Sequence, residues 1–181
     1  MAGWIKLSLV PLFAGVLLAA SEGGVWLDVP FVNQASLAQT KAGCGAAVIS
    51  MLMQYWQAQQ PDRTAPPAAE EILRALYSEN AGGIYASQMD RYLAQHGFRT
   101  FAVQGTAADL RGHLEKGRPL IVALQPRGGE LHYVVVAGLD WKNDVVLKND
   151  PADRKLAKQR QQDFEREWSA AGHWMLLAVP Q

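Results

Sequence analysis

The sequence predicts an α+β fold, in which N-terminal helices pack on a C-terminal antiparallel sheet. Helical spacing of apolar residues dominates between residues 45 and 116. From residue 119 onward, continuous or alternating apolar runs that are typical of strands dominate instead. Because the helices come first and the strands follow one another, the order differs from that of an alternating, doubly wound fold. The part of the chain that follows the first 22 residues has about 160 residues, which suits a single domain at residues 23–181.

The first expected elements are an extended arm and a long helix. Residues 25–32 form a short strand or arm, which Pro30 would confine to a sheet edge. Residues 45–57 form a helix whose apolar side chains fall on one broad face. Such a face is typical of a domain core, and we expect it to pack against the rest of the protein.

The remaining elements follow from caps, breakers and apolar runs. A second helix over 67–79 stops at the Ala81-Gly82-Gly83 break, and a third begins with a capping box of Ser87 and Asp90 and ends at Gly97. A fourth helix over 106–116 begins at Thr106 and ends at Gly117. The other expected elements are strands over 98–103, 119–124, 132–139, 144–148 and 173–179, and a last helix over 159–171.

Residues 1–22 are typical of a targeting segment. Lys6 precedes an apolar stretch, and the small residues Ala19, Ala20 and Ser21 offer a cleavage site. We expect a signal peptide, with an uncleaved N-terminal anchor as the alternative. The domain that follows would then work in the periplasm or outside the cell, without a stable membrane span once the signal is removed.

The charge balance argues against two classes of partner. The chain has 17 basic and 17 acidic residues, and no basic block. Nucleic acids and anionic membranes are therefore not expected as partners.

Cys44 is the only cysteine of the chain and sits in Gly43-Cys44-Gly45, at the start of the expected long helix. Unpaired N–H groups and the positive end of the helix dipole favour a thiolate there, and the thiolate is the nucleophilic form. The alternative is a small buried hydrophobic residue. A single thiol in an exported protein cannot form an intramolecular disulfide, which favours the reactive role.

A thiol nucleophile needs a base, and His132 is the histidine best placed to act as one. If residues 140–143 close a hairpin, His132 lies opposite Pro151, or opposite Asp150 after a slip of one residue. Asp150 would then orient the imidazole, with Asn149 as the alternative orienting residue. His96, His113 and His173 have no such setting, and no pair of histidines has metal-ligand spacing, so we expect neither a metal nor a cofactor.

Acyl transfer also needs donors for a tetrahedral oxyanion. Two glutamines upstream of Cys44 are candidates: Gln39, five residues before it, and Gln34, ten residues before it. Gln39 is favoured because it shares the loop of Cys44, and Gln34 is the alternative.

Taken together, the chain resembles the papain-like cysteine peptidases that remove double-glycine leader peptides from bacteriocins, and their exported relatives. The matching strings are VPFVNQ, GCGAAVISMLMQYW, HYVVVAGLD, VVLKNDPAD and DFEREWSAAGHWMLLAVP, in the order of that family. The resemblance implies a papain-like fold, Cys44 as nucleophile, His132 as base, Asp150 as orienting residue and a glutamine as oxyanion donor. The family's glutamine usually lies about six residues before the cysteine, a spacing that neither Gln39 nor Gln34 reproduces.

The expected function is hydrolysis of peptide bonds through a Cys-His-Asp triad outside the cytoplasm. The substrate would be a peptide or protein, and a separate export machinery is a conceivable partner because the chain carries no transporter portion. Two alternatives stay open: a catalytically weak peptide-binding module of the same fold, and a thiol acyltransferase or amidase that uses the same residues.

Overall fold

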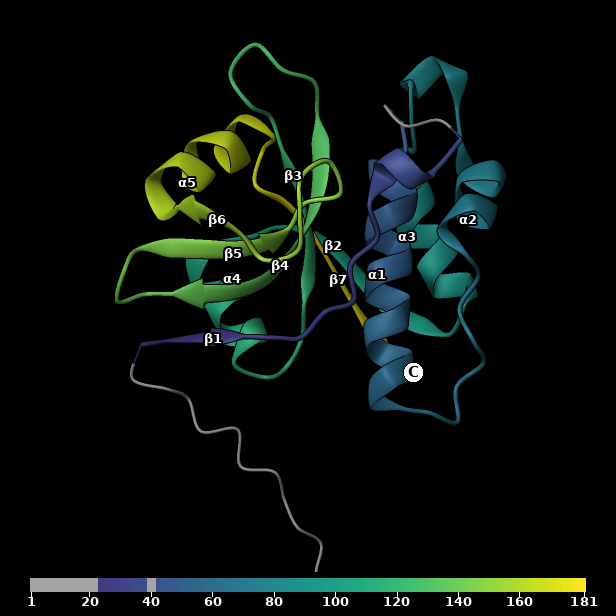
Figure 1. The fold of residues 1–181 in the computed structure, drawn as a ribbon, viewed down its shortest axis with the longest axis horizontal. Coiled ribbons are helices and arrows are strands. Elements are labelled where there is room, and N and C mark those ends of the chain that lie inside the picture. The colour runs from purple at the N-terminus through teal and green to yellow at the C-terminus, as the bar shows by residue number, and fades with distance from the viewer. Residues whose placement is uncertain (1–22, 39–41) are drawn as a thin grey trace, which may run out of the picture.

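A computed structural model of the protein describes residues 23–38 and 42–181 (Figure 1). The predicted signal peptide, residues 1–22, and Gln39 lie outside the described residues. The elements in chain order are β1 (Gly24–Trp26), η1 (Gln34–Ser36), α1 (Cys44–Gln59), α2 (Ala69–Leu76), η2 (Glu79–Ala81), α3 (Ala86–Gln95), β2 (Phe98–Gln104), α4 (Ala107–Leu114), β3 (Leu120–Leu124), β4 (His132–Asp140), β5 (Val145–Asn149), β6 (Ala157–Arg160), α5 (Gln161–Ala170) and β7 (Trp174–Pro180).

The strands of the described residues form one seven-stranded antiparallel sheet, which confirms the α+β prediction. The strand order is β2-β7-β3-β4-β5-β6, and β1 pairs with β4 outside this path. Helices α1, α2 and α3 gather on one side, whereas α4 and α5 lie on the other side of the sheet (Figure 1). Helix α1 packs on β3 and β4, α4 packs on the same two strands, and α5 packs on β3, β5 and β6. All five residues of β3 are buried because both of its faces are covered.

Helix α1 is the central element of the core. Its residues 45–53 are all buried, because the helix lies between the sheet and the pair α2 and α3. Two side chains near its C-terminal end fasten it to the rest of the fold: the Tyr55 hydroxyl donates to the Gly117 carbonyl at 2.8 Å, and the Trp56 indole donates to the Ala178 carbonyl at 2.9 Å. Since the helix is held along its length, its first residue, Cys44, has a fixed position.

Strand β1 and the arm after it run along β4. Strand β1 pairs with the last residues of β4, beyond the point where β3 begins. Gly138 of β4 permits this approach, since a Cβ atom there would lie 2.6 Å from the Val25 carbonyl oxygen. The arm then passes toward the other end of β4, where the Gln34 backbone N–H donates to the Pro151 carbonyl at 2.9 Å. The N-terminal arm therefore links the two ends of β4.

The hairpin register that the sequence suggested is wrong. Asp140 pairs with Val145 and Val135 with Asn149, and the register shifts between Val136 and Gly138. Strand β5 therefore ends opposite Val135, and neither Pro151 nor Asp150 faces His132 within the ladder. A β-bulge of this kind adds one residue to one strand, which spacing alone does not reveal.

Two local predictions also need correction. Helix α3 begins one residue before Ser87, and its capping box joins Tyr85 and Gln88, so Ser87 and Asp90 do not cap it. The stretch 157–160 is a strand, β6, whereas a helix was expected from residue 159. Its residues Ala157-Lys158-Gln159-Arg160 carry no β-branched or aromatic side chain, and the strand exists because it pairs with β5.

Candidate active site

Cys44 is the first residue of α1, as expected. The N-cap is Gly43, which has no side chain to occupy the N–H groups of the first turn. The next residue, Gly45, is closely packed, because a Cβ atom there would lie 3.0 Å from the Cβ of Ile84. The thiol is half-buried and free. The helix start therefore presents a sulfur atom beside backbone donors.

The fold brings three of the predicted site residues into one row. The side chain of Cys44 lies close enough to the His132 imidazole to raise its pKa. On the far side of the ring, Nε2 of His132 lies 2.7 Å from Oδ1 of Asp150. Because Nε2 is engaged by the carboxylate, Nδ1 is the ring nitrogen left for the sulfur. A thiol from α1, an imidazole from β4 and a carboxylate from the turn after β5 thus lie together, with a hydrogen bond between the imidazole and the carboxylate.

The electrostatics of this row favour a protonated imidazole. Burial lowers the pKa of His132, but the hydrogen bonds and charges of Asp150 and Cys44 more than offset it and raise the pKa from 6.5 to about 9. The sign follows from linkage: the protonated ring stabilises the fold fully below pH 6.5, and this contribution is lost as the pH rises through about 9.

Asp150 is held on both oxygens. Besides His132, Oδ1 accepts from the Ala152 backbone N–H at 3.1 Å, and Oδ2 accepts from the Lys148 ammonium at 2.8 Å. Burial raises the pKa of Asp150, but His132 and Lys148 outweigh it and hold the pKa well below 3.8. The carboxylate is therefore charged at neutral pH.

Asp150 reaches His132 from a turn and not from the β5 ladder. Its N–H donates to the Arg154 carbonyl, and its own carbonyl accepts from the Asp153 N–H. This turn brings the carboxylate back toward the start of β4. The predicted proximity of His132 and Asp150 is present, although the predicted register is not.

The amide of Asn149, the alternative orienting residue, is engaged elsewhere. Its Nδ2 donates to the carbonyls of Val29 and Pro30, at 3.0 and 3.2 Å, and its Oδ1 accepts from the Leu156 N–H at 2.9 Å. The side chain is fully buried, and these bonds tie the N-terminal arm to the loop that carries Asp150. The group that contacts the imidazole is Asp150.

Replacing Asn149 by alanine should lower the free energy of unfolding by roughly 2–4 kcal/mol, because two carbonyls and one N–H of the buried arm and loop lose their partner. Urea denaturation measures the change. The matched control is Asn143→Ala, since Asn143 bonds Asp140 in an exposed turn and its loss should cost under about 1 kcal/mol. Equal losses for the two variants would contradict the clamping role of Asn149.

Of the two candidate glutamines, only Gln34 lies in the described part of the chain. It begins η1, and its backbone bond to Pro151 places it next to the residue that follows Asp150. Its Oε1 is buried, with no hydrogen-bond partner among the described residues. The hydrogen bonds of Asn149 to Val29 and Pro30 hold the arm in place. Gln34, ten residues before Cys44 in sequence, therefore lies at the same end of the sheet as Asp150.

The other histidines lie apart from this row. His96 Nδ1 lies 2.7 Å from the Tyr92 carbonyl oxygen, and His173 Nε2 lies 2.7 Å from a carboxylate oxygen of Glu165, a partner that the sequence did not reveal. Within residues 23–38 and 42–181, no group of three or more His, Cys, Asp or Glu residues could hold a metal ion.

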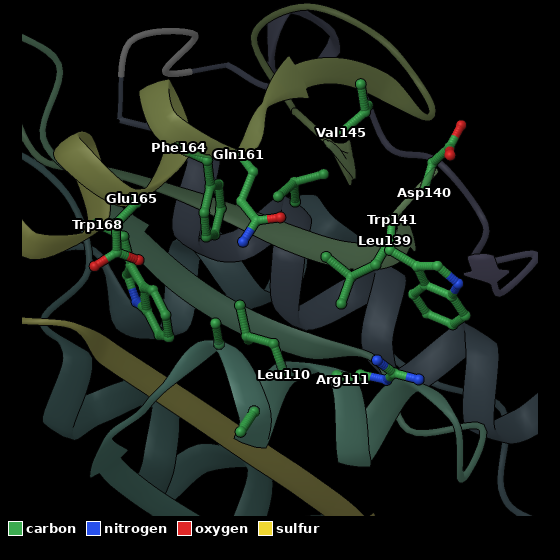
Figure 2. Close-up of a pocket in the computed structure, with 13 residues that line it drawn as sticks. Leu110, Arg111, Leu139, Asp140, Trp141, Val145, Gln161, Phe164, Glu165 and Trp168 are labelled. Carbon is green, nitrogen blue, oxygen red and sulfur yellow. The ribbon is translucent and has the colours of Figure 1, made fainter. Parts of the chain in front are cut away.

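A separate cavity of about 290 Å³ lies at the opposite end of β4 (Figure 2). Its apolar lining includes Leu110, Phe164 and Trp168, and Asp140 and Trp141 stand at one side of it. His132 begins β4 and Asp140 ends it, so Asp140, which lines the cavity, lies roughly 25 Å along the strand from His132. It is not part of the candidate active site.

An α+β fold with a helix-start thiol, an imidazole and a carboxylate in line is typical of cysteine peptidases. The family described as "Peptidase_C39 like family" matches residues 26–175, and the chain belongs to this family. No curated protein matches the chain significantly.

Solved structures share the fold at low sequence identity. A protein from Bacillus anthracis described as a C39-like peptidase has a TM-score of 0.65 and 16% identity over 87% of this chain and 98% of its own. A double glycine motif protease of an AMS/PCAT transporter, solved with its leader peptide, has a TM-score of 0.65 and 20% identity over 90% and 97%. The peptidase domain of Streptococcus ComA, a bifunctional ABC transporter of a quorum-sensing pathway, has a TM-score of 0.60 and 20% identity over 78% and 93%. The expected resemblance in fold to double-glycine peptidase domains is thereby confirmed.

From the sequence, the domain is expected to have no stable membrane span once the signal peptide is removed. Among the described residues, none of the helices has both the length and the apolar character needed to cross a bilayer.

Proposed function

We propose that the protein is a cysteine peptidase that hydrolyses peptide bonds with Cys44 as nucleophile, His132 as acid–base and Asp150 as orienting residue. The observation that carries the proposal is the His132–Asp150 pair beside the only cysteine of the chain: Nε2 of His132 lies 2.7 Å from Oδ1 of Asp150, and Cys44 is near enough to raise the pKa of the imidazole. Membership of a peptidase family supports the same conclusion.

In the proposed mechanism, the Cys44 thiolate, paired with the His132 imidazolium, attacks the carbonyl carbon of a peptide bond. The oxyanion is bound by a backbone N–H at the start of α1 and by the side-chain amide of Gln34. His132 then gives its proton to the leaving amine, and a thioester forms on Cys44. Water, deprotonated by His132, hydrolyses the thioester and restores the enzyme.

The test is cleavage of a library of fluorescence-quenched peptides, with and without a Gly-Gly pair before the cleavage site. Mass spectrometry of the products, with and without an added amine acceptor, separates hydrolysis from acyl transfer. The proposal expects two free peptides as the main products. A library that remains uncut while it binds the protein would favour the peptide-binding module instead.

The pH dependence of the reaction should report His132. We expect kcat/KM to fall at alkaline pH with a midpoint near 9, because the raised pKa of His132 marks where the imidazolium loses its proton. In Asp150→Asn, the charge that stabilises the imidazolium is removed, so the alkaline midpoint should move to lower pH. An unchanged midpoint in this variant would contradict the assignment of Asp150.

We also propose that the peptidase acts outside the cytoplasm, in the periplasm or beyond, with residues 1–22 as its export signal. The short basic start, the apolar stretch and the small residues at 19–21 support this location.

A further inference from the structure

Among the residues that the structure describes, Lys148 is a charged residue beside the Cys-His-Asp row that the proposed mechanism leaves unused. It lies on β5, two residues before Asp150, and its ammonium is 2.8 Å from Oδ2 of that residue. Both side chains are only 12% exposed. A buried ion pair is a weak source of stability, because the desolvation of two charges offsets most of their attraction. Stability alone therefore does not account for the ion pair of Lys148 and Asp150.

The two oxygens of Asp150 have separate partners. Oδ1 accepts from His132 and from the Ala152 N–H, whereas Oδ2 accepts from Lys148. With a partner on one oxygen only, a carboxylate can rotate about its side-chain bond and release the imidazole. With both oxygens bound, the plane of the carboxylate is fixed, and so is the direction in which Oδ1 faces His132.

We propose that Lys148 is a positioning residue of the active site, which holds Oδ2 of Asp150 so that Oδ1 stays aligned with His132. The positive charge of Lys148 also weakens the stabilisation of the His132 imidazolium by Asp150. This inference rests on the proposed peptidase function. It assigns to Lys148 two separable effects, one on orientation through its hydrogen bond and one on proton affinity through its charge.

The charged groups around the imidazole define the electrostatic effect. His132 is faced by Cys44 from α1 and by Asp150 from the turn after β5, and Lys148 acts on it through Asp150. The neighbouring Tyr133 stays protonated, because burial and the nearby Cys44 raise its pKa to about 12. A cation beside Asp150 weakens the attraction between this carboxylate and the imidazolium. Removal of the cation should therefore raise the pKa of His132.

Three substitutions separate the effects. Lys148→Met removes the hydrogen bond and the charge, Lys148→Gln keeps a donor without the charge, and Lys148→Arg keeps both. Lys142→Met, in the exposed turn at the far end of β4, is the matched control. Two quantities are measured for each protein: kcat/KM on the best peptide of the quenched library, as a function of pH, and the His132 pKa from NMR of protein with labelled histidine.

We expect Lys148→Met to lower kcat/KM roughly tenfold, since the carboxylate of Asp150 is no longer held in line with His132. The pKa of His132 and the alkaline midpoint of the pH profile should both rise. Lys148→Gln should keep most of the rate but show the same upward pKa shift. Lys148→Arg and Lys142→Met should match the wild type in both quantities.

An unchanged His132 pKa in both Lys148→Met and Lys148→Gln would overturn the inference, as would a Lys148→Arg variant that behaves like Lys148→Met. The NMR titration needs no substrate. If the wild type cleaved no peptide, the proposed function would fail, whereas the coupling of Lys148 to His132 would still be measured. His173, which pairs with Glu165, serves as the internal reference in the same spectra.

Discussion

Replacement of Cys44 by alanine is expected to lower kcat/KM for peptide cleavage by at least about 10⁴-fold, because no other thiol of the chain can form the acyl-enzyme. The loss should appear in kcat, with substrate binding retained. Steady-state kinetics on the best library peptide, together with a binding titration of the same peptide, would measure both.

The variant must remain folded for this result to count. Cys44 makes no disulfide and is only half-buried, so the free energy of unfolding of Cys44→Ala should be within about 1 kcal/mol of that of the wild type. Cys44→Ser, which keeps a hydrogen-bonding atom beside His132, should be nearly as inactive because a hydroxyl is a far weaker nucleophile than a thiolate. Cleavage at the wild-type rate by folded Cys44→Ala would exclude a cysteine peptidase.

Replacement of Gln34 by alanine is expected to lower kcat by roughly 10²–10³-fold with little change in KM, because an oxyanion donor acts mainly in the transition state. Gln34 is preferred over Gln39 since the bond from its backbone to the Pro151 carbonyl places it beside the Asp150 turn. Initial-rate kinetics over a range of substrate concentrations separates kcat from KM.

Gln39→Ala is the matched control, as the same substitution five residues before Cys44 in the sequence. It should retain kcat within about threefold of the wild type. The opposite pattern, a large loss in Gln39→Ala and none in Gln34→Ala, would return the oxyanion role to Gln39, the residue that the sequence favoured.

Much of the fold could be predicted from local sequence signals. The helix that begins at Cys44 follows from its glycine flanks and its apolar face, and Thr106 caps α4 as expected. The order of helices before strands predicted the fold class, and the apolar run at 119–124 predicted the strand β3, which the structure shows to be fully buried. These features depend on periods of a few residues, which a single sequence displays directly.

The parts that could not be predicted depend on contacts between distant segments. The register of β4 and β5 is set by a bulge, and β6 exists only through its pairing with β5. The position of Gln34 is set by the Asn149 clamp and by Pro151, neither of which is close to it in sequence. Lys148 was missed, although its place two residues before Asp150, near the end of a strand, was the signal that could have revealed it.

The activation of Cys44 by the fold is tested by comparing two rates. They are the rates at which Cys44 reacts with a thiol-directed peptide inhibitor in the folded protein and in the same protein unfolded in urea. Intact-mass spectrometry at pH 6 follows the adduct, and peptide mapping locates it. If His132 and the start of α1 activate the thiol, the folded protein should react at least about tenfold faster than the unfolded chain, and His132→Ala should remove this advantage. A folded protein that reacts no faster than the unfolded one would show that the fold does not activate Cys44 as a nucleophile.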